Sequence, residues 1–107
     1  MAVIDVLGTE YEIIESDKLK DYTLENNDGY CDFSTKKIVI DTFKTSPGSM
    51  EDLDTYKKQV IRHELVHAFL FESGLDASSW GKNEEIVDWI AIQAIKLMDA
   101  FRKADAI

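Results

Sequence analysis

Short runs of alternating apolar and polar residues occur in two parts of the first 41 positions of the chain, and this alternation is typical of β-strands with one buried face. Residues 2–16 carry two such runs around a Gly-Thr pair, and Tyr11 and Ile13 alternate there with glutamates. Residues 29–41 carry two more runs around a Ser-Thr pair. Residues 17–28 lack periodicity and end in turn-forming residues. The pattern predicts two hairpins joined by a loop or a short helical turn.

The period then changes to that of a helix. Ser49 and Asp52 have the arrangement of a capping box, so the helix is expected to run from about residue 50 to residue 73 and to stop at Gly74. Residues 60–71 are apolar on nearly every side of this helix. Such a segment is expected to be sandwiched between other elements rather than to lie on a surface.

A second helix is expected over residues 83–102, after a loop rich in Gly and Ser, with Asn83 as its N-cap. Strands followed by two long helices indicate the α+β class, here as a single domain over residues 1–107. We expect about four strands, in an antiparallel or mixed sheet, packed on both helices. The apolar stripe of the second helix comprises Ile86, Val87, Ile90, Ala91, Ala94, Ile95, Met98 and Phe101.

Composition and charge restrict the partners. The formal net charge of −9 and the lack of a basic stripe argue against nucleic-acid binding. A basic peptide or protein partner would suit this charge, although solubility is the simpler explanation. There is no apolar run of membrane-spanning length and no secretory signal pattern. Cys31 is the only thiol, which excludes an internal disulfide and is in keeping with a cytoplasmic location.

The only two histidines of the chain lie in the stretch HELVH, at positions 63 and 67. Four residues separate them, so they project from one helix face, one turn apart, and both imidazoles can reach one tetrahedral cation. Glu64 points about 100° away and lies near enough to contact a water on that cation. HExxH also occurs by chance. However, two histidines and a glutamate left unpaired in an apolar helix would cost roughly 1–3 kcal/mol per polar group.

A catalytic zinc site needs three protein ligands, and without a further histidine the third must be a carboxylate. The stretch NEEIVD offers Glu84 and Glu85. On a helical wheel Glu84 falls on the face that packs on the protein, whereas Glu85 faces solvent. Asp88 lies beside Glu84 and is suited to accept the free ring N–H of a ligand histidine. Favourable placement of acids at a helix N-terminus is the alternative, and it explains Glu85 better than Asp88.

The combination of HELVH with NEEIVD on a later helix resembles the gluzincins, the thermolysin-like zinc metallopeptidases with the pattern HExxH and then Asn-Glu-x-x-x-Asp. The length is closest to the minimal, single-domain minigluzincins, and the chain is also similar to small metallopeptidase-like proteins of phages and mobile elements. The resemblance spans roughly residues 29–95. It implies a zincin-like fold, His63, His67 and Glu84 as zinc ligands, Glu64 as the general base, Asp88 behind His63, and a location in the host cytoplasm if the gene is phage-borne.

The chain departs from thermolysin in having no histidine after His67 to stabilise the tetrahedral intermediate. The conceivable donors are Tyr30 and Tyr56, and beyond them Trp80 and Lys82. The expected activity is hydrolysis of a peptide or protein substrate that pairs with the edge of the 29–41 hairpin. The alternative is a metal-stabilised module that binds a protein without cleaving it. Zinc suits two imidazoles and a carboxylate, and cobalt, nickel or iron could also occupy them. Cys31, on the same hairpin, is better interpreted as a small buried residue than as a ligand.

Overall fold

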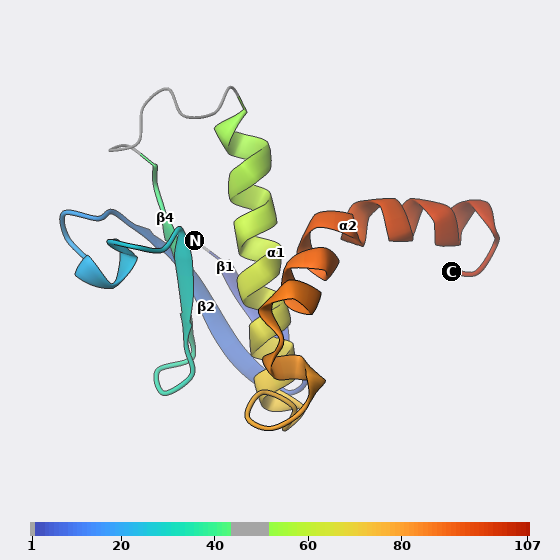
Figure 1. Cartoon of the computed structure of the whole chain (residues 1–107), viewed down its shortest axis with the longest axis horizontal. Helices are drawn as coiled ribbons and strands as arrows, with labels where there is room; N and C mark the ends of the chain where they lie inside the picture. Colours follow the sequence, from blue (N-terminus) through green and yellow to red (C-terminus); the bar gives the residue numbers. More distant parts are fainter. Residues whose placement is uncertain (1, 44–51) are drawn as a thin grey trace.

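The computed structural model describes residues 2–43 and 52–107 of the chain. Its strands are β1 (Ala2–Val6), β2 (Thr9–Ser16), β3 (Gly29–Asp32) and β4 (Lys37–Asp41), and its helices are α1 (Leu53–Glu72) and α2 (Glu84–Lys103), with short 3-10 turns η1 (Tyr22–Leu24) and η2 (Trp80–Lys82). In Figure 1 the sheet lies on one side of α1, and α2 lies on the other. The predicted α+β class and the sheet of four strands are confirmed. The expectation that the sheet packs on both helices is corrected, because the sheet packs on α1 and α2 packs chiefly on α1.

The sheet is mixed, with the strand order β1-β2-β4-β3. The outer pairs β1–β2 and β3–β4 are antiparallel hairpins, and the central pair β2–β4 is parallel. Both predicted hairpins are therefore confirmed. The first turn consists of Leu7 and Gly8, whose φ angles of 51° and 92° suit a tight two-residue hairpin loop. Strand β3 forms one edge of the sheet, and this edge lies beside the site described below.

The hydrophobic core lies between the sheet and α1. Alternate residues of β2 and β4 point into it, including Tyr11, Ile13, Ile38 and Ile40, and Val60 and Ala68 of α1 meet them. The segment of α1 that the sequence predicted to be sandwiched does lie between the sheet and α2 (Figure 1). Buried apolar side chains of this kind are the main source of folding free energy.

Glu72, at the end of α1, fastens that helix to the sheet through polar contacts. Its carboxylate accepts hydrogen bonds from Thr9 Oγ1 at 3.1 Å and from Tyr11 Oη at 2.7 Å, and it pairs with Lys36 Nζ at 3.0 Å. These three partners hold the pKa of Glu72 below its ordinary value, chiefly through the hydrogen bond from Tyr11. The C-terminal end of α1 is thus tied to both hairpins, through β2 of the first and the turn of the second.

The observed start of α1 corrects the predicted one. Asp52 is the N-cap, with non-helical φ and ψ, and its side chain accepts a hydrogen bond from the backbone N–H of Thr55. The helix begins at Leu53, so Asp52 is not the third residue of a capping box; Ser49, the predicted cap, lies outside the described residues. The predicted end is confirmed, because α1 stops at Glu72 and Gly74 follows with a φ of +76°.

Helix α2 begins as predicted, with Asn83 as its N-cap, but its apolar stripe is only partly covered. Within the stripe, Val87 and Ala91 are fully buried, whereas Ile95 is 63% exposed and Phe101 is 44% exposed. Figure 1 shows the reason: α2 rises beside α1 and then turns away, so its C-terminal half leaves the body of the protein. Neither α2 nor any other helix in the described ranges is long and apolar enough to cross a membrane.

Candidate metal centre

Helix α1 presents the two histidines side by side. The rings of His63 and His67 lie 4.8 Å apart between centroids, and both side chains are mostly buried. This proximity follows from their spacing of four residues, which is close to one helical turn. Both Nε2 atoms point toward the first turn of α2, where the expected third ligand lies.

Helix α2 brings Glu84 to the two histidines. Glu84 Oε2 is 3.2 Å from His63 Nε2, and Glu84 Oε1 is 2.9 Å from His67 Nε2. The side chain of Asn83 accepts hydrogen bonds from two backbone N–H groups of α2, which makes Glu84 the first residue of the helix. The structure therefore brings together the predicted trio His63, His67 and Glu84, although the Glu84 side chain remains 67% exposed.

These three side chains have the donor atoms and the spacing of a metal site. One ligand atom from each lies within 4.8 Å of the others. Two ligands that are each about 2.0–2.1 Å from a tetrahedral zinc ion lie about 3.3 Å from each other. The separations of 2.9 and 3.2 Å between the imidazole nitrogens and the carboxylate are close to that value. The group could therefore hold a metal ion, although its donor atoms are not specific to zinc.

Asp88 lies one turn after Glu84 and faces the other nitrogen of His63. Asp88 Oδ1 is 3.3 Å from His63 Nδ1, at the distance of a long hydrogen bond. The predicted position of Asp88 behind a ligand histidine agrees with this contact. Glu85, the alternative ligand, is exposed, and its carboxylate is not part of the group formed by His63, His67 and Glu84 within the described ranges.

Glu64 is the buried acid of the site. The residue is only 8% exposed, and its carboxylate has no hydrogen-bond or ion-pair partner among residues 2–43 and 52–107. Burial raises the pKa of Glu64 to about 7 because it penalises the charged form; the nearby Glu84 acts in the same direction and His63 opposes it. A carboxyl group in this setting can bind or release a proton near neutral pH.

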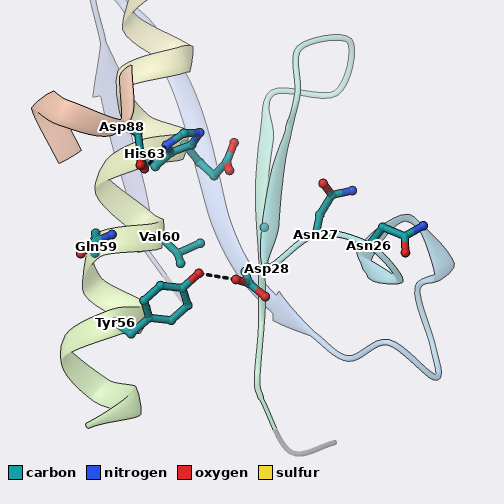
Figure 2. Close-up of a pocket in the computed structure, with 10 residues that line it drawn as sticks. Asn26, Asn27, Asp28, Tyr56, Gln59, Val60, His63 and Asp88 are labelled. Carbon is teal, nitrogen blue, oxygen red and sulfur yellow. Dashed lines mark hydrogen bonds and ion pairs between the residues drawn. The ribbon is translucent and has the colours of Figure 1, made fainter. Parts of the chain in front are cut away.

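Two pockets adjoin Glu64, in the space between α1 and β3. The first, here called the Tyr56 pocket, has a volume of about 250 Å³, and the second, the Phe33 pocket, has about 430 Å³. Both are lined by Asn27, Gly29, His63 and Glu64. Figure 2 shows the Tyr56 pocket, with α1 on one side and the segment that carries Asn26, Asn27 and Asp28 on the other. Glu64 and His63 therefore lie where the linings of the two pockets meet.

The predicted donors Tyr30 and Tyr56 line one pocket each, but their hydroxyl groups are engaged. Tyr30 donates to Asp21, and Tyr56 donates to Asp28. Each hydroxyl has a single proton, so neither tyrosine can donate to an oxyanion in this arrangement unless its hydroxyl turns. The other conceivable donors, Trp80 and Lys82, belong to η2, and neither lines the Tyr56 pocket or the Phe33 pocket.

Cys31 packs against the core and also lines the Phe33 pocket. Burial raises the pKa of its thiol to about 12, so the thiol stays protonated at neutral pH. Among the described residues it does not join the group formed by His63, His67 and Glu84. These observations agree with the interpretation of Cys31 as a partly buried packing residue.

Sequence reasoning missed several residues that line the pockets, among them Asp28, Gly29 and Gln59 of the Tyr56 pocket. The turn-forming residues around position 28 gave no reason to expect that Asp28 lines a pocket. Gly29 carried a readable signal, since glycine within a strand often marks a close approach of another element. A Cβ atom at Gly29 would lie 2.9 Å from Val60 Cγ1, which shows how closely β3 approaches α1 here.

Comparisons with known protein families, with curated proteins and with solved structures found no match to this chain.

Proposed function

We propose that this chain is a zinc-dependent peptidase with a gluzincin-type site and a minimal zincin-like fold. His63, His67 and Glu84 would hold the metal, Glu64 would act as the general base, and Asp88 would orient His63. The observation that carries the proposal is the meeting of three ligand side chains from two helices beside a buried, unpartnered glutamate. The two pockets that Glu64 lines provide room for a substrate next to it.

The protons of His63 add support. This ring faces a carboxylate at each nitrogen, Glu84 at Nε2 and Asp88 at Nδ1. A neutral imidazole has one N–H and can donate to only one of them. With a cation between Nε2 and Glu84, a neutral ring still has Nδ1–H to donate to Asp88, and metal binding requires the neutral ring.

Zinc held by these residues would supply a Lewis acid for a peptide carbonyl and for a water molecule. Glu64 would accept a proton from the attacking water and deliver it to the leaving amine. Its position on α1, between the two ligand histidines in the chain and in the lining of both pockets, places the carboxylate where a substrate would lie. Asp88 would keep His63 in the tautomer whose Nε2 is free to bind metal.

The test is hydrolysis of a peptide library by the zinc-loaded protein, by Glu64→Gln and by the matched control Glu85→Gln. Both substitutions replace a glutamate by its neutral isostere near the site, but only Glu64 lines the pockets. We expect cleavage by wild type and Glu85→Gln and none by Glu64→Gln. Cleavage that survives Glu64→Gln would refute the assigned base.

A second function, a metal-stabilised module that binds a protein without cleaving it, is favoured by one observation. Both tyrosines that could stabilise an oxyanion donate their protons to aspartates instead. Isolation of a stable, uncleaved partner, together with metal binding and no hydrolysis of the library, would support this function over the first.

A further inference from the structure

The Tyr56 pocket combines a defined shape with one sign of charge. Its walls carry the carboxylates of Asp28, Glu64 and Asp88, and neither this pocket nor the Phe33 pocket is lined by a lysine or arginine. Most of the other lining groups are amides and a hydroxyl, whose oxygens can accept hydrogen bonds. A ligand that brings donors and positive charge matches these walls, whereas an acidic ligand would meet repulsion.

Asp28 is the carboxylate of this pocket that the proposed chemistry does not use. Asp88 contacts His63, and Glu64 lies beside the ligands. Asp28 comes from the other wall, across the pocket from Asp88, as Figure 2 shows. One of its oxygens, Oδ2, accepts the hydroxyl proton of Tyr56, and Oδ1 accepts no hydrogen bond from any residue in the described part of the chain.

The wall that carries Asp28 is fixed before any ligand arrives. The backbone N–H of Asp41 donates to the carbonyl oxygen of Asp28 at 2.9 Å. Lys18 Nζ donates to the carbonyl oxygen of Asn27 at 2.9 Å and pairs with the buried Asp41 at 3.4 Å. The hydrogen bond to Asp28 raises the pKa of Tyr56 to about 12, so the tyrosine remains a donor at neutral pH. A carboxylate held in this way costs little further ordering on binding.

A second observation indicates that a ligand enters here. Only 8% of the Glu64 residue is exposed, yet it lines the pocket, and its carboxylate forms no hydrogen bond or ion pair with the described residues. Its oxygens are not among the fully buried atoms without a partner, so they remain accessible from the pocket, where a donor on a bound ligand can reach them. The volume of about 250 Å³ lies below the range of roughly 300–1,000 Å³ that holds a whole drug-sized ligand. The pocket therefore suits one side chain of a longer molecule.

We propose that the Tyr56 pocket binds an arginine or lysine side chain of the substrate, close to the bond that is cleaved, and that Asp28 selects it. This rests on the proposed peptidase function and adds a substrate class to it. The free Oδ1 of Asp28 accepts a hydrogen bond from the guanidinium or ammonium group, and the amide oxygens around it accept others. An arginine side chain should bind more tightly than lysine, because its planar guanidinium group can donate hydrogen bonds to Asp28 and to a neighbouring acceptor at the same time.

The test uses zinc-loaded Glu64→Gln, which binds without cleaving, and fluorescent peptides that differ at one scanned position by Arg, Lys, citrulline or Glu. Citrulline has the shape of arginine without its charge. We expect at one position about tenfold tighter binding of Arg than of citrulline, as for a hydrogen bond to a charged group, and weakest binding of Glu. When Asp28→Asn, which keeps an acceptor for the Tyr56 hydroxyl, is combined with Glu64→Gln, we expect Arg and citrulline peptides to bind equally. Adding Glu25→Gln, on the same segment but lining neither pocket, keeps the difference between them.

The peptidase function and the role of Asp28 can be tested separately if kcat/KM of the wild type is measured on the same peptides. Binding or cleavage with no preference for charge at any position overturns the role of Asp28 and leaves the peptidase standing. No binding and no cleavage of any peptide overturns both. If the circular dichroism spectrum shows that Asp28→Asn alters the fold, the salt dependence of binding to Glu64→Gln is measured instead of that variant. In about 1 M NaCl, where the Debye length is about 3 Å, the preference for Arg should shrink toward that for citrulline. A preference unchanged by salt contradicts the proposal.

Discussion

Asp88→Ala should weaken zinc binding without removing a ligand. Asp88 Oδ1 lies 3.3 Å from Nδ1 of His63, so its loss frees the ring to adopt the tautomer that cannot bind through Nε2. Removal of such a partner typically lowers metal affinity by about 10- to 100-fold, which is about 1.4–2.7 kcal/mol. The long contact and the 52% exposure of the Asp88 side chain favour the lower end of that range. We therefore expect a loss of about tenfold.

The affinity can be measured by competition with a chromophoric zinc chelator at neutral pH. Glu85→Ala is the matched control, because it removes the same charge from the same helix but leaves the contact with His63 intact. Any loss shared by both variants reflects net charge, and the excess in Asp88→Ala measures the contact itself. Equal affinities of Asp88→Ala and Glu85→Ala would refute the assigned role of Asp88.

Three further predictions concern the frame of the site. Arg62→Met removes the hydrogen bond of 2.6 Å that Arg62 Nε donates to the carbonyl oxygen of Ala91, which ties α1 to α2. We expect the free energy of unfolding in urea to fall by about 1.5–3 kcal/mol and zinc binding to weaken, and unchanged values of both would contradict this. Because the pKa of Glu72 is lowered in the folded state, the contribution of Glu72 to stability is present above pH 4.5 and is lost as the pH falls. The difference in free energy of unfolding between wild type and Glu72→Gln should therefore shrink in acid, and a difference that stays constant with pH would contradict this prediction. Gly29→Ala places a methyl group 2.9 Å from Val60 Cγ1 and should cost about 1–3 kcal/mol in thermal unfolding; full stability would show that β3 can move away from α1.

Local rules were enough to predict the elements of this fold. Alternation gave both hairpins, because strands with one buried face must place apolar residues at every second position. Gly74 and Asn83 marked the ends of the helices, since each meets a specific backbone need there. The meeting of HELVH with Glu84 was also predictable, because helical spacing decides which side chains share a face.

Features that depend on distant contacts were not predictable. The start of α1 at Leu53 was missed because both Ser49 and Asp52 have cap chemistry, and the sequence alone does not rank them. The exposed half of α2 was missed because periodicity shows an apolar face without showing whether anything covers it. Asp28 was missed because its pocket forms only when the 17–28 segment meets α1, far along the chain.

The most direct test of the metal site is the zinc content per chain after dialysis at neutral pH, for wild type, Glu84→Ala and Glu85→Ala. Both substitutions shorten a glutamate in the first turn of α2, but only Glu84 faces the two histidines. A site formed by His63, His67 and Glu84 predicts one zinc in the wild type and in Glu85→Ala, with loss of zinc in Glu84→Ala. A wild type that retains no zinc, or a loss confined to Glu85→Ala, would contradict it.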